Sequence, residues 1–262
     1  MKKYISGADS SGKSSGKRCL AKRSLAAALV FLIGMLLLGT VLIYASTAYH
    51  ADDRAMKLEK KLESDGHLTW ENGYAVLTPK ESKKQAEGII FYPGGLVDAR
   101  AYLPQLNAFR QRGYTCVLLT MPFDLAVFDM KAADYIYPNL KKLDVDEWYL
   151  CGHSLGGVAA GQTFLGQENP YSGLILLGSY VTDPEASSQD ILTIYGSQDG
   201  VLHKEKVSEK TSQVEVLSGG NHGQFGDYGH QAGDGKAEIS REKQQSETAE
   251  AVEEFIISRR KK

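Results

Sequence analysis

One short segment of the sequence constrains the fold more strongly than any other. It contains Gly-x-Ser-x-Gly at Gly152, Ser154 and Gly156. The mostly apolar residues 147–151 before it are typical of a buried strand, and the small residues 158–165 after it are typical of a packed helix. A serine between a strand and a helix forms a nucleophile elbow, so the segment predicts an α/β fold with Ser154 presented at a strand end.

The chemistry of a serine nucleophile explains this spacing. A serine hydroxyl attacks well only when it is held in place and supplied with a base. The turn that lifts it from the sheet strains the backbone, and Gly152 and Gly156 remove Cβ atoms that would clash there. The turn also leaves the Leu155 amide at the positive end of a helix dipole, where it can donate to an oxyanion. We therefore expect an acid and a histidine later in the chain.

Two later turns supply these partners for Ser154. A predicted strand over residues 191–195 runs into a turn with Asp199, and a predicted strand over residues 214–217 runs into a turn with His222. Both side chains thus follow the carboxyl end of a strand, the edge at which open α/β sheets carry their sites. We expect His222 to take the serine proton and Asp199 to hold the imidazole and stabilise its charged form.

Other acids and histidines compete for these roles. Asp183 precedes a proline in a loop, and Asp190 lies before its strand, at the opposite edge of the sheet. His203 sits in a charged segment, and His153 lies inside the elbow with its side chain expected to point away from the serine. His230 stays open as an alternative, as does a loop histidine or turn aspartate without any role.

A second oxyanion donor is expected from the loop after the strand predicted over residues 88–92. That loop reads Pro93-Gly94-Gly95-Leu96, and its glycines let the backbone approach a reacting carbonyl. The amide of either Gly95 or Leu96 would join that of Leu155, and the sequence does not choose between them. A simple tight turn is the alternative.

The rest of the main domain alternates strands and helices, which predicts a mostly parallel sheet with helices on both faces. The sheet begins with a hairpin, because Asn72-Gly73 lies between two apolar runs. We expect strands over residues 68–70, 74–77, 88–92, 116–119, 147–151, 174–177, 191–195 and 214–217, and helices over residues 101–112, 132–140, 158–165, 204–211 and 240–260.

The N-terminal part differs in composition. Residues 1–23 are polar and basic and predict a disordered cytoplasmic tail. Residues 24–47 contain 20 consecutive uncharged positions from Leu25 to Tyr44, enough for a helix to cross a bilayer core of about 30 Å. We expect a retained transmembrane anchor, with a cleaved signal peptide as the alternative. The basic flank then places the main domain outside the cytoplasm, in a single-pass protein of the cell membrane.

Residues 48–66 are rich in charged residues and favour a helix, and we expect them to form a stalk. We expect residues 67–262 to form the catalytic domain. Residues 48–262 carry 23 basic and 31 acidic residues, a net charge of −8, which argues against nucleic acid as a partner. No cluster has metal-ligand spacing, and we expect no cofactor. The cysteines, Cys19, Cys116 and Cys151, include no Cys-x-x-Cys pair, and the last two are expected to be buried thiols.

With these residues in view, the chain resembles the α/β-hydrolase superfamily over about residues 67–262, in the serine, aspartate, histidine order of its triad. More narrowly it resembles the small membrane-anchored bacterial hydrolases of the "alpha/beta hydrolase fold-5" group, related to dienelactone hydrolases. Two features depart from that pattern: Ser154 stands where dienelactone hydrolases have cysteine, and Pro93-Gly94 replaces the common His-Gly pair. The motifs that carry the resemblance are residues 92–95, 121–123, 152–157, 196–200 and 219–229.

The resemblance implies hydrolysis of an ester or a similar acyl group. Residues 178–190 leave no room for a cap domain, so we expect an open site unless residues 121–140 or 223–236 fold over it. The leading hypothesis is a membrane-anchored serine hydrolase that cleaves a small-molecule ester, thioester or lactone through an acyl-enzyme on Ser154. The alternatives are an acyltransferase with the same triad and an inactive hydrolase fold that serves as a binding module.

Overall fold

The computed structural model describes residues 29–36, 38–40, 47–166, 169–181 and 190–260, which fall into two units, residues 1–47 and 48–262. In the first unit, residues 29–36 and 38–40 are helical. None of the helices described is both long and apolar enough to span a membrane. Much of the predicted anchor, residues 24–28, 37 and 41–46, lies outside the described residues.

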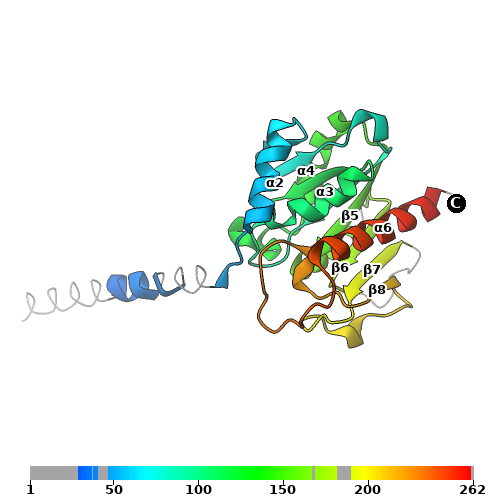
Figure 1. The fold of residues 1–262 in the computed structure, drawn as a ribbon. Helices are drawn as coiled ribbons and strands as arrows, with labels where there is room; N and C mark the ends of the chain where they lie inside the picture. The colour runs from blue at the N-terminus through cyan, green and yellow to red at the C-terminus, as the bar shows by residue number, and fades with distance from the viewer. Residues whose placement is uncertain (1–28, 37, 41–46, 167–168, 182–189, 261–262) are drawn as a thin grey trace, which may run out of the picture. The chain divides into compact units, whose positions relative to one another are not determined.

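The second unit is built on an eight-stranded sheet in the order β1-β2-β4-β3-β5-β6-β7-β8 (Figure 1). β1 and β2 form the predicted hairpin with Gly73 at φ 90°, β2 pairs antiparallel with β4, and the strands from β4 to β8 run parallel. The strands are Leu68–Glu71, Tyr74–Leu77, Glu87–Tyr92, Thr115–Leu119, Glu147–His153, Gly173–Leu177, Ile191–Gly196 and Gln213–Leu217 for β1 to β8.

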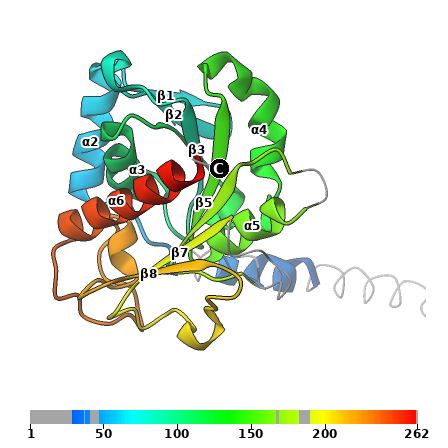
Figure 2. The same ribbon diagram turned by 90° about the vertical axis from the view of Figure 1, so that its right-hand side faces the viewer.

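Helices cover both faces of this sheet, because side chains alternate along each buried strand (Figure 2). In β5, Tyr149 and Cys151 pack in a core with α2, α3 and α6, whereas Trp148 and Leu150 pack in a second core with α4 and α5. The helices are α2 Asp53–Ser64, α3 Leu103–Gln111, α4 Ala132–Leu140, α5 Leu155–Phe164 and α6 Arg241–Arg260. The α/β architecture expected from the sequence is therefore present.

The stalk predicted for residues 48–66 is wrong. These residues belong to the second unit, in which Leu58 and Leu62 of α2 pack against the core and Ala55 is fully buried. Asp52 caps α2 by accepting hydrogen bonds from the Arg54 and Ala55 amides. The prediction failed because charged residues outnumber this narrow apolar face.

The prediction of a helix over residues 204–211 is also wrong. Only a short 3₁₀ turn, Lys204–Lys206, forms there, and the chain is extended at Val207. The carbonyl of Ser208 then accepts hydrogen bonds from the Thr211 and Ser212 amides, at 3.0 Å each. Serine and threonine favour such turns over helix interiors, which explains the difference.

The packing of α2 gives a stability prediction. Leu62→Ala should lower the free energy of unfolding by about 2–4 kcal/mol, because it leaves a cavity in the core. The exposed Lys57→Ala on the same helix is the matched control and should change stability by less than about 0.5 kcal/mol. Urea unfolding of the full chain measures both, and equal, small effects would mean that α2 does not belong to the cooperative domain.

Candidate active site

The predicted elbow joins β5 to α5. Ser154 has φ 52° and ψ −122°, a backbone conformation that side-chain-bearing residues rarely adopt. A Cβ atom on Gly152 would lie 2.4 Å from the Gly156 carbonyl oxygen, and one on Gly156 would lie 2.2 Å from the Pro93 carbonyl oxygen. Both positions therefore require glycine, as the spacing of the motif predicts.

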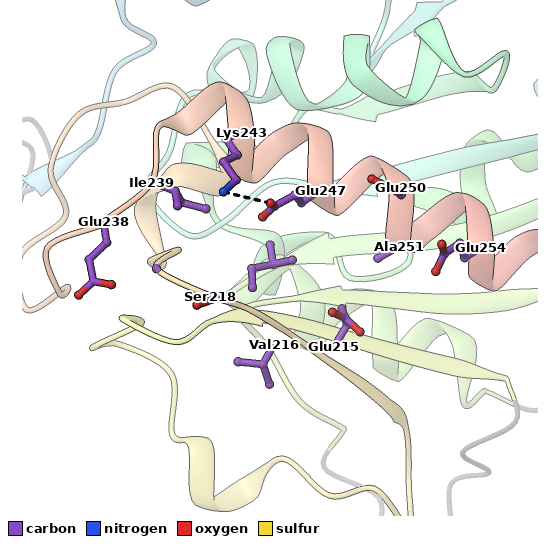
Figure 3. Close-up of a pocket in the computed structure, with 12 residues that line it drawn as sticks. Glu215, Val216, Ser218, Glu238, Ile239, Lys243, Glu247, Glu250, Ala251 and Glu254 are labelled. Atoms are coloured by element: carbon purple, nitrogen blue, oxygen red, sulfur yellow. Dashed lines mark ion pairs between the residues drawn. The ribbon is translucent and has the colours of Figure 1, made fainter.

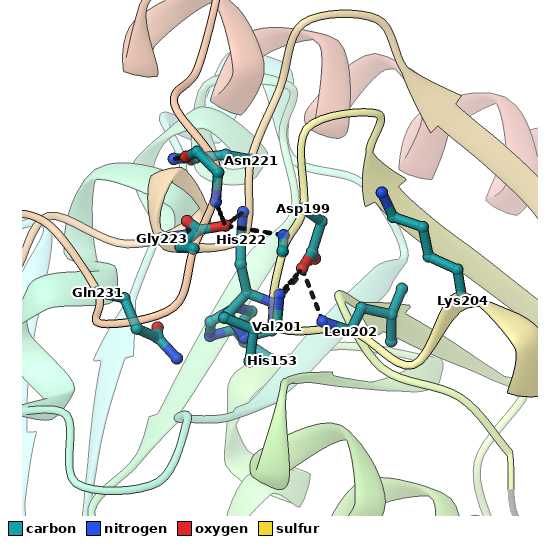
Figure 4. A network of polar contacts seen from close by, with 12 residues as sticks. His153, Asp199, Val201, Leu202, Lys204, Asn221, His222, Gly223 and Gln231 are labelled. Atoms are coloured by element: carbon teal, nitrogen blue, oxygen red, sulfur yellow. Dashed lines mark hydrogen bonds and ion pairs between the residues drawn. The ribbon is translucent and has the colours of Figure 1, made fainter.

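The structure brings Asp199 and His222 together in the buried network of Figure 4. His222 Nδ1 lies 2.8 Å from Asp199 Oδ2, and the two residues are 1% and 4% exposed. Asp199 Oδ1 accepts hydrogen bonds from the amides of Val201, at 2.9 Å, and Leu202, at 2.8 Å. Both oxygens of the Asp199 carboxylate thus have a hydrogen-bond partner, and these contacts fix the orientation of the carboxylate toward the imidazole.

These contacts decide the charge of Asp199. Burial alone would raise its pKa, but the hydrogen bond and charge of His222, with the Leu202 and Val201 amides, lower that pKa below its ordinary value. An ionised carboxylate accepts the Nδ1 proton of His222, which leaves the Nε2 lone pair free. His222 Nε2 is buried and has no hydrogen-bond partner among the described residues, so it is available as a base.

The imidazole of His222 lies beside the elbow. Its ring centroid is 4.5 Å from that of His153, the residue before Ser154. Gly178, at the end of β6, lies against the same ring, because a Cβ there would come within 2.8 Å of His222 Nδ1. The Ser154 amide is held by the Leu177 carbonyl oxygen at 2.9 Å. The ends of β5, β6, β7 and β8 therefore converge on the three residues predicted from the sequence.

The loop after β3 lies against the start of α5. A Cβ atom on Gly95 would lie 2.9 Å from Leu155 Cδ2. The Leu96 amide donates to the Asp124 carbonyl oxygen at 2.7 Å, which removes Leu96 from the two alternatives left by the sequence. The amides of Gly95 and Leu155 make no hydrogen bond to any other described residue.

A contact between Tyr102 and His153 was not predicted. From the sequence, Tyr102 is only one of three residues, with Asp98 and Arg100, that could line the mouth of the pocket, and His153 is expected to point away from the serine. Tyr102 Oη accepts the Gly94 amide hydrogen bond at 3.0 Å and lies 2.8 Å from His153 Nδ1. Burial, with the neighbouring His222, holds the pKa of His153 well below its usual range, so the ring is neutral. This chain of contacts joins the Gly94-Gly95 loop to the ring on which His222 rests.

Asp234 is a second residue that the sequence did not reveal. Its carboxylate accepts hydrogen bonds from four amides, those of Gly200, His222, Gly223 and Gly235, at 2.8–3.2 Å. It thereby ties the turn that carries Asp199 to the turn that carries the histidine. In the sequence, only its position between Gly233 and Gly235 could have suggested that Asp234 lies in a tight turn near the site.

The competing residues lie elsewhere. His203 is exposed and contacts Glu205, His230 is exposed, and Asp190 pairs with Arg259 at 2.7 Å. Asp183 lies outside the described residues. A groove between β8 and α6, rich in glutamate, contains none of the three converging residues (Figure 3). Among the described residues no group of histidine, cysteine, aspartate or glutamate could hold a metal ion.

A family model described as the alpha/beta hydrolase family matches residues 88–246, which include Ser154, Asp199 and His222. The chain belongs to the alpha/beta hydrolase family. No curated protein matches the sequence. The family assignment agrees with the resemblance drawn from the elbow and the two strand-end turns.

Solved structures share the fold at low sequence identity. Est1E from Butyrivibrio proteoclasticus superimposes with a TM-score of 0.51 at 17% identity, covering 74% of this chain and 98% of that one. MenH from S. aureus gives 0.52 at 12% identity, covering 72% and 100%. MGS-MChE2, an alpha/beta hydrolase from the metagenome of lagoon sediments, gives 0.50 at 14% identity, covering 74% and 99%. These likenesses establish the fold.

Tyr102 supplies a prediction with an internal control. Tyr102→Phe should lower the free energy of unfolding by about 1–3 kcal/mol, because the Gly94 amide and His153 Nδ1 lose a buried partner. Tyr114→Phe should be neutral or stabilising, since its buried hydroxyl has no hydrogen-bond partner among the described residues. Denaturant unfolding of both variants measures the difference, and equal effects would show that the Tyr102 contacts do not stabilise the site.

Proposed function

We propose that this hydrolase is a serine hydrolase that cleaves a carboxylic ester, thioester or lactone through an acyl-enzyme on Ser154. The buried Asp199–His222 pair carries the proposal, because it leaves Nε2 unpartnered beside the strained elbow. A base held in this tautomer next to a presented serine is the arrangement that activates the hydroxyl.

The proposed reaction uses each of these groups in turn. Ser154 Oγ attacks the acyl carbon while His222 Nε2 takes its proton, and Asp199 stabilises the imidazolium. The amides of Gly95 and Leu155 donate to the oxyanion. Collapse breaks the bond to the alcohol or thiol, which leaves with the proton from Nε2. Water, deprotonated by the same nitrogen, then attacks the acyl-enzyme and releases the acid and the free serine.

Two features favour hydrolysis over the other functions considered. Ser154 is partly exposed, so water can reach an acyl group bound to it. The Asp199 carboxylate and the His222 ring are fully hydrogen bonded on the sides that face each other, whereas an inactive binding module needs no such arrangement.

Labelling by a fluorophosphonate probe tests the proposal. The full chain in detergent should be labelled at Ser154, and Asp199→Asn should slow labelling by about 10⁴-fold because the imidazole loses its tautomer. Ser154→Ala should abolish labelling. Ser218→Ala, which removes an exposed serine from the groove of Figure 3, should label like the parent. An unlabelled parent, or a labelled Ser154→Ala chain, would overturn the proposed function.

We further propose that residues 24–47 anchor the enzyme in the cell membrane, with the catalytic domain outside the cytoplasm. The run of 20 uncharged residues from Leu25 to Tyr44 and the basic flank before it support this topology. Protease added to intact cells should digest the catalytic domain and spare a tag placed at the N-terminus. Digestion of the tag alone would contradict the orientation, and recovery of the whole chain in a salt-washed soluble fraction would contradict the anchor.

A further inference from the structure

Three apolar side chains stand exposed on the turns between β4 and α4. Phe123, Val127 and Phe128 are 70%, 53% and 63% exposed. The two aromatic rings contact each other edge to face, with centroids 5.9 Å apart. Scattered apolar residues are ordinary on a protein surface, but a contiguous exposed apolar patch is a candidate interaction site.

The backbone beneath this patch is strained. Phe123 and Asp124 are consecutive residues with φ values of 54° and 51°, in the left-handed region that favours glycine. Such conformations cost free energy and persist at sites where they serve a function. The Leu96 amide holds the strained turn by donating to the Asp124 carbonyl oxygen at 2.7 Å. The fold therefore keeps a strained turn that places the ring of Phe123 in solvent.

The patch borders the proposed catalytic site. Leu125, within the same turns, lies 3.5 Å from the position that a Cβ atom on Gly95 would occupy. The residues Ala126–Phe128 pack on α5, the helix that begins directly after Ser154. Phe123, Val127 and Phe128 thus form an apolar surface beside the elbow and beside the loop that carries Gly95. We call this surface the aromatic rim.

The chain enters the catalytic domain at the same place. The Tyr49 amide donates to the Leu96 carbonyl oxygen at 2.7 Å, and the Asp98 amide donates to the Tyr49 carbonyl oxygen at 2.9 Å. The 20-residue span that we expect to cross the membrane ends at Tyr44, five residues before Tyr49 in the sequence. Five residues reach at most about 18 Å, so a membrane anchor there would hold the loop beside Gly95 close to the bilayer.

We propose that the aromatic rim enters the interfacial region of the membrane and that Ser154 acts on acyl substrates that reside in that membrane. This inference rests on the proposed function and on the proposed anchor. Aromatic side chains favour the headgroup level of a bilayer, where apolar contact and water are both available. Asp124 and Asp129 flank the rim, so we expect it to bind a zwitterionic surface without any need for anionic lipid.

Two substrates separate this role from catalysis itself. The full chain and a variant with Phe123→Ser and Phe128→Ser are placed in phosphatidylcholine vesicles. Hydrolysis of a water-soluble short-chain ester should be equal within about twofold, since neither residue belongs to the proposed machinery. Hydrolysis of a long-chain ester dissolved in the bilayer should fall at least about tenfold, because two apolar rings no longer enter the interface. An equal loss on both substrates, or on neither, would overturn the inference.

A physical measurement separates this inference from the proposed chemistry. In a Ser154→Ala background, Phe128→Trp in vesicles of brominated phosphatidylcholine should show tryptophan quenching beyond that of the parent. Ile257→Trp is the control, because Ile257 lies on α6 near Arg260, which pairs with Glu87 at the opposite edge of the sheet. No additional quenching at residue 128 would refute the rim while leaving the chemistry intact. Quenching at residue 128, combined with a parent chain whose Ser154 the fluorophosphonate probe does not label, would refute the chemistry and leave the rim.

Discussion

The backbone conformation of Ser154 is the constraint on which the rest of the site depends. A left-handed, side-chain-bearing residue costs about 1–3 kcal/mol, and it persists because β5 and α5 fix the chain on both sides of it. After this turn, the backbone of Gly156 lies against Pro93, the residue that follows β3. This close contact joins the elbow to the loop that carries Gly94 and Gly95.

The histidine side of the site is held by contacts between loops. Asp234 fixes the turns of Asp199 and His222 relative to each other through backbone amides. Tyr102 and His153 support the imidazole from the other direction, through a ring that burial keeps neutral. A second charge next to His222 would disfavour a charged imidazole there, so the role that we propose for His222 depends on the neutral state of His153 as well as on its position.

Much of this arrangement was predictable from the sequence because it depends on local patterns. The parallel strands are short apolar runs that end in turns, and their order along the chain places Ser154, Asp199 and His222 at one edge of the sheet. That the Leu96 amide is already occupied was not predictable, because its partner, the Asp124 carbonyl oxygen, lies far along the chain. The packing of α2 was missed because Ala55, Leu58 and Leu62 are a narrow apolar face among charged residues. The contacts of Tyr102 and Asp234 likewise join segments that have no common sequence pattern.

In the mechanism that we propose, the Asp199–His222 pair makes Ser154 a nucleophile that carries the acyl group. Rapid mixing of the full chain with p-nitrophenyl acetate, followed by an acid quench and peptide mass spectrometry, tests it most directly. We expect a burst of p-nitrophenol equal to about one per chain and an acetyl group on the peptide that contains Ser154. In His222→Ala we expect neither the burst nor the acetyl group. Turnover of the ester without an acetyl group on Ser154, or an unchanged burst in His222→Ala, would contradict this mechanism.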